Sequence, residues 1–173
     1  TSDQSENNFI YYVLGKKERH TLADYVTGVE ETSTNKIVLY SSAQTGKTTE
    51  LKQLCWELQQ SGLYLPVSFE VRTNTKLKRD DLPESQYVDG REVVLVIDAL
   101  DEVNGQKYED LLEEIGGYAY EHPEMKMVLS CRSNFRRERQ LELFTELFLE
   151  ELSIDDARDY AAKREVNSDR FMR

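Results

Sequence analysis

The chain has 173 residues, of which 39% are hydrophobic and 32% are charged, so one globular domain with a sizeable apolar core is expected. Its formal net charge is −11, and an acidic surface repels the phosphates of nucleic acids and of anionic lipids. Composition therefore argues against a general nucleic-acid-binding role, although it leaves room for a local basic groove. No apolar run reaches the ~18 residues that a membrane span needs.

Cysteine and histidine usage narrows the chemistry further. Cys55 and Cys131 are far apart and lack the spacing of a metal site, and two thiols do not make a disulfide framework. We interpret them as buried free thiols in a reducing, cytoplasmic compartment. With only His20 and His122, a histidine metal site or triad is not favoured. The sequence lacks an initiator methionine and ends just after a helical pattern, so we expect a piece of a longer protein.

Three elements are predicted before residue 41. Residues 9–14 form an apolar run that fits either a strand or a helix. Residues 21–24 have the spacing of a capping box, and apolar residues then recur at helical intervals, which predicts a short helix. Residues 36–40 (KIVLY) are apolar without alternation and rich in β-branched side chains, which predicts a buried strand.

An amphipathic helix is predicted over residues 48–60, and Gly62 would end it. Trp56 lies off the apolar stripe of this helix, where it could contact a neighbouring element or a further domain. The stripe itself consists of Leu51, Leu54, Cys55 and Leu58.

The middle of the chain alternates between apolar and polar stretches. Residues 64–71 are predicted to form a second strand. The polar stretch 72–90 is interpreted as a crossover with a short helix and a solvated loop. Its basic cluster at 76–79 favours a solvated face over a ligand site. Residues 92–97 (EVVLVI) form the clearest buried strand of the chain.

Helical spacing returns over residues 108–120, although two consecutive glycines within this stretch could end or kink the helix. Residues 126–130 predict another strand. Residues 136–152 are ambiguous, with a helix expected first and a strand near 147–149.

A second capping-box pattern at 153–156 predicts a final helix towards Lys163. The alternation of strands with helices and crossovers implies a parallel sheet that is covered on both faces. We therefore expect a tail and lead-in helix over residues 1–34, an α/β core over 35–165, and a truncated end over 166–173.

The segment from Ser41 to Thr48 lies between a predicted strand and a predicted helix, the setting of a phosphate-binding loop. Main-chain N–H groups of such a loop bind phosphate together with the free N–H groups and the positive dipole end of the helix. The segment departs from the pattern G-x-x-x-x-G-K-[ST] at its first position. The predicted nucleotide-binding residues are Ser41, Ser42, Ala43, Gln44, Thr45, Gly46, Lys47, Thr48 and Thr49.

The buried strand predicted over residues 92–97 leads into acidic residues, which is a second indication of a phosphate-binding site. In parallel α/β sheets, ligands bind at the carboxyl ends of the strands. Asp98 there could hold Mg²⁺, and an acid a few residues later, Asp101 or Glu102, could polarise an attacking water. The alternative is an acidic turn that caps the next helix.

The strand 126–130 ends in Ser130 and leads into Arg132, so both polar groups would reach the same edge of the sheet. The guanidinium of Arg132 could contact a terminal phosphate. The alternative is a surface arginine in a salt bridge.

These segments resemble a known family. The string Asp98-Ala-Leu-Asp101-Glu102 resembles the Walker B segment of NACHT-type P-loop ATPases of the STAND class, whose pattern is D-[GA]-L-D-E. Residues 126–132 resemble the sensor-1 strand of that class, and residues 148–153 its L-x-x-L-S segment. The resemblance covers roughly residues 35–163, and Ser41 is its departure.

The resemblance implies a three-layer αβα sandwich of the P-loop NTPase, ASCE type, with a five-stranded, mostly parallel sheet in the order 5-1-4-3-2. It also implies that Thr48 and Asp98 hold Mg²⁺ beside ATP or ADP, that Glu102 activates water, with Asp101 sharing either role, and that Arg132 is a sensor. C-terminal helical and sensor domains of the same protein and a nucleotide-dependent homo-oligomer are further implications.

Three functions compete on this basis. The first is the core of a regulatory ATPase in a signalling or defence protein. The second is a nucleotide-binding assembly switch with little hydrolysis, which Ser41 favours. The third is a P-loop small-molecule kinase, whose arginine-rich lid would draw on Arg132, Arg136, Arg137 and Arg139.

Overall fold

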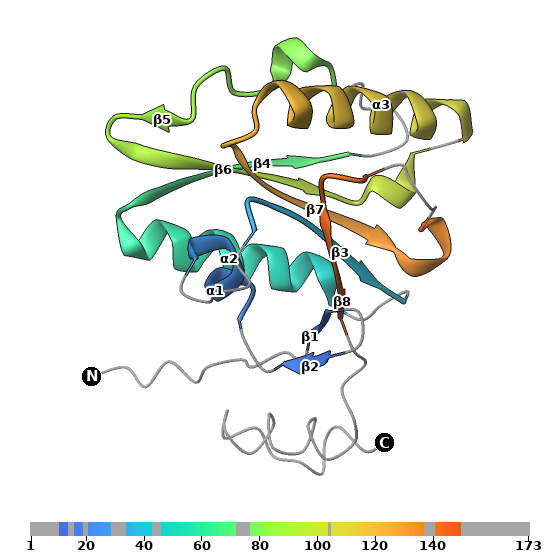
Figure 1. Ribbon diagram of the computed structural model, residues 1–173, viewed down its shortest axis with the longest axis horizontal. Helices are drawn as coiled ribbons and strands as arrows, with labels where there is room; N and C mark the ends of the chain where they lie inside the picture. The colour runs from blue at the N-terminus through green and yellow to red at the C-terminus, as the bar shows by residue number, and fades with distance from the viewer. Residues whose placement is uncertain are drawn as a thin grey trace.

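The computed structural model describes residues 11–13, 16–18, 21–28, 34–42, 46–71, 77–103, 105–136 and 141–149. Within these residues, one sheet carries helices on both faces (Figure 1). Helices α1 (Leu22–Thr27) and α2 (Lys47–Ser61) cover one face, and α3 (Gly105–Glu121) covers the other. The strands are β1 (Tyr11–Val13), β2 (Lys16–Glu18), β3 (Lys36–Ser41), β4 (Tyr64–Glu70), β5 (Tyr87–Val88), β6 (Arg91–Asp98), β7 (Lys126–Arg132) and β8 (Thr145–Leu149).

The strand order confirms the predicted core topology. The parallel strands lie in the order β8-β3-β7-β6-β4, which in chain order is 5-1-4-3-2. The described sheet has eight strands and not five, because three antiparallel strands join this core. The strands β1 and β2 extend it beyond β8, and β5 pairs with the start of β6.

Side chains of the central strands alternate between two apolar layers. In β6, Val93, Leu95 and Ile97 pack towards α3. Val94 and Val96 pack towards α1 and α2. All five are buried, so a strand with continuous apolar sequence is covered on both faces. This alternation fixes which face each functional side chain at the strand ends will occupy.

The helices follow their predicted local signals. The capping box at the start of α1 is present in both directions, because Thr21 and Asp24 each accept a hydrogen bond from the other's main-chain N–H. Helix α2 ends at Gly62, which is left-handed with φ 70°. Helix α3 runs through Gly116 and Gly117 to Glu121, so these two glycines do not end it.

The crossover between β4 and β6 differs from its prediction. A short 3-10 turn, η1 (Arg79–Asp81), is present. Where a solvated loop was expected, β5 and β6 form a hairpin whose two-residue turn, Asp89-Gly90, has φ of 51° and 75°. Two positive φ angles are typical of a type I′ turn, for which Asp-Gly is a favoured sequence. The Asp-Gly dipeptide therefore indicated a hairpin, and the interpretation of this stretch as a loop did not take it into account.

Lys36 ties the start of β3 to the end of α3. Its side chain is buried, and its Nζ donates to the main-chain carbonyls of His122, Pro123 and Met125 at 2.8–3.1 Å. Burial lowers the pKa of this amine. A lysine within an otherwise apolar strand therefore stabilises the turn that follows α3.

Several predictions concern residues that lie wholly or partly outside the described part of the chain. The predicted helix at 153–163, the domain boundary at 165 and part of the 76–79 cluster lie outside them. Within the cluster, Arg79 pairs with Glu121 of α3 and packs against Gly117. In 136–152, strand β8 is present as expected, whereas residues 141–144 form a turn and not the helix that was expected first; residues 137–140 and 150–152 lie outside the described residues. Among the described helices, none combines the length and apolarity of a membrane span.

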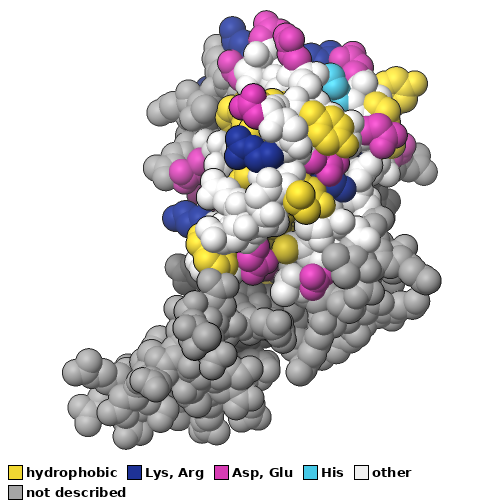
Figure 2. Space-filling view, turned by 90° about the vertical axis from the view of Figure 1, so that its left-hand side faces the viewer, with side chains coloured by type: hydrophobic (Ala, Val, Ile, Leu, Met, Phe, Trp, Pro, Cys, Tyr) yellow, Lys and Arg dark blue, Asp and Glu magenta, His cyan; other side chains and the backbone are white. Residues whose placement is uncertain are grey.

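Figure 2 shows the face at the start of the parallel strands, on the left of Figure 1. There, hydrophobic side chains are interspersed with acidic and basic ones. The carboxyl ends of the strands, where the predicted site residues gather, face away from this view.

Candidate functional site

The alternation of β6 places Asp98 beside the start of α2. Asp98 follows Val94 and Val96 at intervals of two, so its side chain lies on the face that α2 covers. Strand β3 leads into α2 through the predicted phosphate loop, which brings Thr48 to the same spot. Thr48 Oγ1 donates a hydrogen bond to Asp98 Oδ2 at 2.8 Å. Two residues fifty positions apart thereby meet at the carboxyl edge of the sheet.

The start of α2 is built to leave main-chain donors available. Its N-cap is Gly46, which is left-handed at φ 94° and has no side chain to cap the helix. The first N–H groups of an α-helix have no partner within the helix, so an uncapped end is suited to an anion. The space around Gly46 would admit a Cβ, so crowding does not require glycine here. The positive φ does. The predicted loop residues Ala43, Gln44 and Thr45 lie outside the described residues.

Ser41 occupies the position where the phosphate-loop pattern has glycine. It is the last residue of β3, buried, and paired in register with Arg132 of β7. Its hydroxyl donates to the carbonyl of Ser42 at 3.1 Å. Within the described residues, positive φ at a non-glycine residue occurs at Asp89 and Ala99 and not at Ser41. The backbone here therefore does not demand glycine, which accounts for the departure from the pattern.

Ser130 supports Asp98 from the neighbouring strand. Its hydroxyl, fully buried in β7, donates to Asp98 Oδ1 and accepts a hydrogen bond from the main-chain N–H of Ala99 at 3.0 Å. The two oxygens of Asp98 are thus held by Thr48 and Ser130. Ser130 was expected to bring a polar group to this edge of the sheet, but its hydrogen bonds to Asp98 and Ala99 were not predicted.

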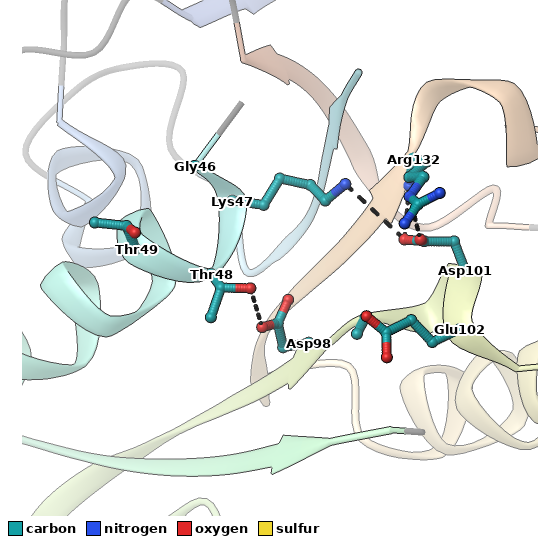
Figure 3. A pocket seen from close by; sticks show the side chains of 9 residues that line it. Gly46, Lys47, Thr48, Thr49, Asp98, Asp101, Glu102 and Arg132 are labelled. Atoms are coloured by element: carbon teal, nitrogen blue, oxygen red, sulfur yellow. Dashed lines mark hydrogen bonds and ion pairs between the residues drawn. The ribbon is translucent and has the colours of Figure 1, made fainter. Parts of the chain in front are cut away.

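A left-handed residue separates the acids that follow β6. Ala99 has φ 65°, which turns the chain into the 3-10 helix η2 (Leu100–Glu102). The turn buries Leu100 completely in the α3 layer. A residue with a Cβ adopts the left-handed conformation at a cost of about 1 kcal/mol, so Ala99 is a strained position beside the site. As a result, Asp101 and Glu102 project from one short turn in different directions (Figure 3).

Asp101 contacts the two cations of the site. Its carboxylate forms an ion pair with Arg132 Nε at 2.8 Å and accepts a hydrogen bond from the main-chain N–H of Arg132 at 2.9 Å. Lys47 Nζ lies 3.9 Å from the same group. The Asp101 side chain is only 4% exposed, whereas that of Arg132 is 46% exposed. Arg132 therefore lies in a salt bridge, as the alternative reading expected, and also borders the site.

One cavity of about 340 Å³ unites these groups. Figure 3 shows Lys47 and Arg132 directed towards Asp101, Thr48 directed towards Asp98, and Glu102 projecting from η2 on the same side. The lining residues are Gly46, Lys47, Thr48, Thr49, Asp98, Ala99, Asp101, Glu102 and Arg132. The structure thus brings together every predicted catalytic and metal-binding residue, and the described members of the loop from Gly46 to Thr49.

The donors at Thr48 and Asp98 fit a magnesium ion. Both offer hard oxygen atoms, and they lie 2.8 Å apart. Mg²⁺ typically takes one or two protein oxygens and completes its octahedron with water and phosphate oxygens. The described residues contain no cluster of three or more His, Cys, Asp or Glu side chains that could hold a metal without such help. A magnesium ion held by these two oxygens would take its other ligands from water and phosphate.

Cys131 lies between Ser130 and Arg132 but faces the opposite layer. It is a free thiol, 1% exposed, and its Sγ is 3.6 Å from the hydroxyl oxygen of Tyr108. Burial raises the pKa of this thiol to about 11. Cys55, on α2, is half-buried, and burial raises its pKa as well. The expectation of free thiols is confirmed, and full burial holds for Cys131 alone.

The parallel order 5-1-4-3-2, with an uncapped helix after the first strand and an acid at the end of the third, is the fold of P-loop NTPases. No family model matches the sequence, and no curated protein matches it.

Among solved structures, AMPPCP-bound DnaA from Aquifex aeolicus is similar to this chain, with 14% sequence identity and a TM-score of 0.49. The match covers 84% of this chain and 51% of that one, so this chain spans about half the length of DnaA. The DnaC helicase loader is similar with 15% identity and a TM-score of 0.43, covering 74% of this chain and 86% of the other. The class of fold rests on the strand order and the site, and not on these likenesses.

Proposed function

We propose that this chain is the nucleotide-binding core of a regulatory ATPase, which binds ATP or ADP with Mg²⁺ and hydrolyses ATP slowly. One observation carries the proposal. Lys47, Thr48, Asp98 and Glu102 line a single cavity at the uncapped start of α2. A cation, a hydroxyl, a buried carboxylate and a second acid are the groups that phosphoryl transfer requires in one place.

Each residue has a distinct part in this proposal. The ammonium of Lys47 and the first N–H groups of α2 would bind the β- and γ-phosphates. Thr48 and Asp98 would hold Mg²⁺, which neutralises phosphate charge when it is bound. Glu102 would orient and polarise the attacking water, since it projects from η2 into the same cavity. Arg132 would contact the terminal phosphate.

The arginines that follow β7 bear on the kinase alternative. Arg136 makes a bidentate ion pair with Glu146 of β8, with N–O distances of 2.7–2.9 Å. Its guanidinium also lies 5.8 Å from the ring centre of Phe148. Arg136 is thus engaged with β8, which disfavours a role as a phosphate-binding lid residue. Arg137 and Arg139 lie outside the described residues.

The regulatory role rests on the resemblance of Asp98–Glu102 to the NACHT-type segment. On that basis, nucleotide exchange and hydrolysis would switch a signalling or defence protein between resting and assembled states. The partners would be further helical and sensor domains of the same protein and, with nucleotide bound, other copies of the chain. An assembly switch with little hydrolysis is the alternative within this class.

Binding and turnover by wild type and Glu102→Gln would test the function. In-line attack on the γ-phosphate requires charge neutralisation and exclusion of water, to which an arginine from a neighbouring subunit contributes ~10³–10⁵ in rate in related enzymes. We expect the chain alone to bind MgATP but to turn over less than about once per minute. Glu102→Gln should abolish that residual rate and leave ATP affinity within a few-fold. A variant as active as wild type would exclude Glu102 as the base.

A further inference from the structure

Asp101 differs from the other acids of the site in its burial and its partners. Its carboxylate meets both the main-chain N–H and the Nε of Arg132, at 2.9 and 2.8 Å. Two contacts to one residue fix a side chain's direction as well as its position. With its side chain 4% exposed, Asp101 is not placed to exchange a water molecule with solvent. Its geometry is that of a support for Arg132.

This support leaves most of the guanidinium available. An arginine side chain carries five N–H donors, of which Nε supplies one and the two Nη atoms supply four. Asp101 holds the Nε side, and Figure 3 shows the guanidinium at the edge of the cavity that Lys47 and Thr48 border. The Nη groups are therefore the part of Arg132 that can meet an anion in the cavity.

Lys47 is the second cation near Asp101, and it is also the residue proposed to bind the phosphates. Its Nζ lies 3.9 Å from Asp101, long for a hydrogen bond and within the range of an ion pair. A phosphate bound at the start of α2 would draw the ammonium towards itself and weaken this contact. Asp101 would then keep Arg132 as its remaining close cationic partner. The contact between Asp101 and Arg132 is thus suited to persist when nucleotide binds.

We propose that Asp101 is a positioning residue that makes the site prefer a triphosphate, because it holds Arg132 where its Nη groups contact the γ-phosphate. This inference rests on the proposed nucleotide site. It assigns to Asp101 a role other than magnesium binding or water activation. A diphosphate lacks the group that Arg132 would contact, so the support should matter for ATP and hardly at all for ADP.

The test is the ratio of two dissociation constants, for Mg-ADP and for a Mg-bound non-hydrolysable ATP analogue, measured by calorimetry. Wild type should prefer the triphosphate. Asp101→Asn should reduce that preference about tenfold or more, since it removes a charge-assisted contact. Arg132→Gln should reduce it equally, and the double variant should lose no more than either single one. Asp110→Asn, an exposed change of the same kind on α3, should keep the wild-type ratio.

Arg132→Lys provides a second route if Asp101→Asn does not fold. The Arg132 side chain is half-exposed, so the exchange should be tolerated. Lysine keeps the charge but lacks the Nε contact with Asp101, so the preference for the triphosphate should again fall. Three results would overturn the role of Asp101: an unchanged ratio in Asp101→Asn, equal weakening of both nucleotides, or a wild type without preference. Each can arise while binding still depends on Lys47. Loss of that dependence, or no binding by wild type, would overturn the proposed site itself and this inference with it.

Discussion

Each carboxylate oxygen of Asp98 accepts a hydrogen bond from a hydroxyl group. Thr48 donates one of them, and the fully buried Ser130 donates the other. Ser130→Ala would leave Asp98 Oδ1 and the N–H of Ala99 without this buried partner. We expect a loss of about 1–3 kcal/mol in the free energy of unfolding, the usual cost of unsatisfied buried groups. Denaturant unfolding in the absence of nucleotide measures it. Ser68→Ala, on an exposed position of β4, should change stability little, and equal effects of both changes would argue against the network.

Some residue positions could be predicted from the sequence and others could not. Asp98 follows from a buried strand that ends in an acid. The separate directions of Asp101 and Glu102 depend on the left-handed Ala99, and no periodic pattern indicates that conformation. The partner of Asp101 comes from β7, which pairs with β6 only in the folded sheet. Contacts between strands of this kind are beyond local sequence patterns.

At the scale of elements, two glycines in open surroundings should respond to alanine in opposite ways. A Cβ at Gly116 or at Gly90 would meet no atom within 4 Å, so space does not distinguish them. Gly116 lies within α3, and alanine there should stabilise the fold by about 0.5–1 kcal/mol. Gly90 has φ 75° in the hairpin turn, so alanine should cost about 1 kcal/mol. Thermal unfolding of both variants checks the signs, and a gain at Gly90 would contradict the turn.

Most helices and strands could be predicted from the sequence, because the central strands are continuous apolar runs. The parallel order came from the family resemblance, and the register of β3 with β7 and β8 bears it out. The hairpin of β5 and β6 was missed because a two-residue strand has no periodicity to detect. The hydrogen bonds of the buried Lys36 were not predicted for another reason: its three carbonyl partners lie more than eighty residues away.

For the molecule as a whole, the buried thiol of Cys131 predicts a loss of stability in alkali. Its pKa is about 11 in the folded chain and 9.0 in the reference state. Because folding raises this pKa, its contribution is complete below pH ~9 and is lost as pH rises towards 11. Cys131→Ala lacks the titration, so its stability deficit against wild type should shrink by up to ~2–3 kcal/mol over that window. Denaturant unfolding at pH 8 and pH 11 measures this, and a constant deficit would contradict the burial of the thiol.

The central claim is that a nucleotide binds at the start of α2, and calorimetry with Mg-ADP tests it most directly. Lys47→Ala removes a charge-assisted contact worth ~2–4 kcal/mol, so the affinity should fall at least about tenfold. Lys52→Ala, on an exposed position of the same helix, removes an equal charge away from the cavity and should leave the affinity within about twofold. Equal affinities of wild type and Lys47→Ala for Mg-ADP would contradict the assignment of this site.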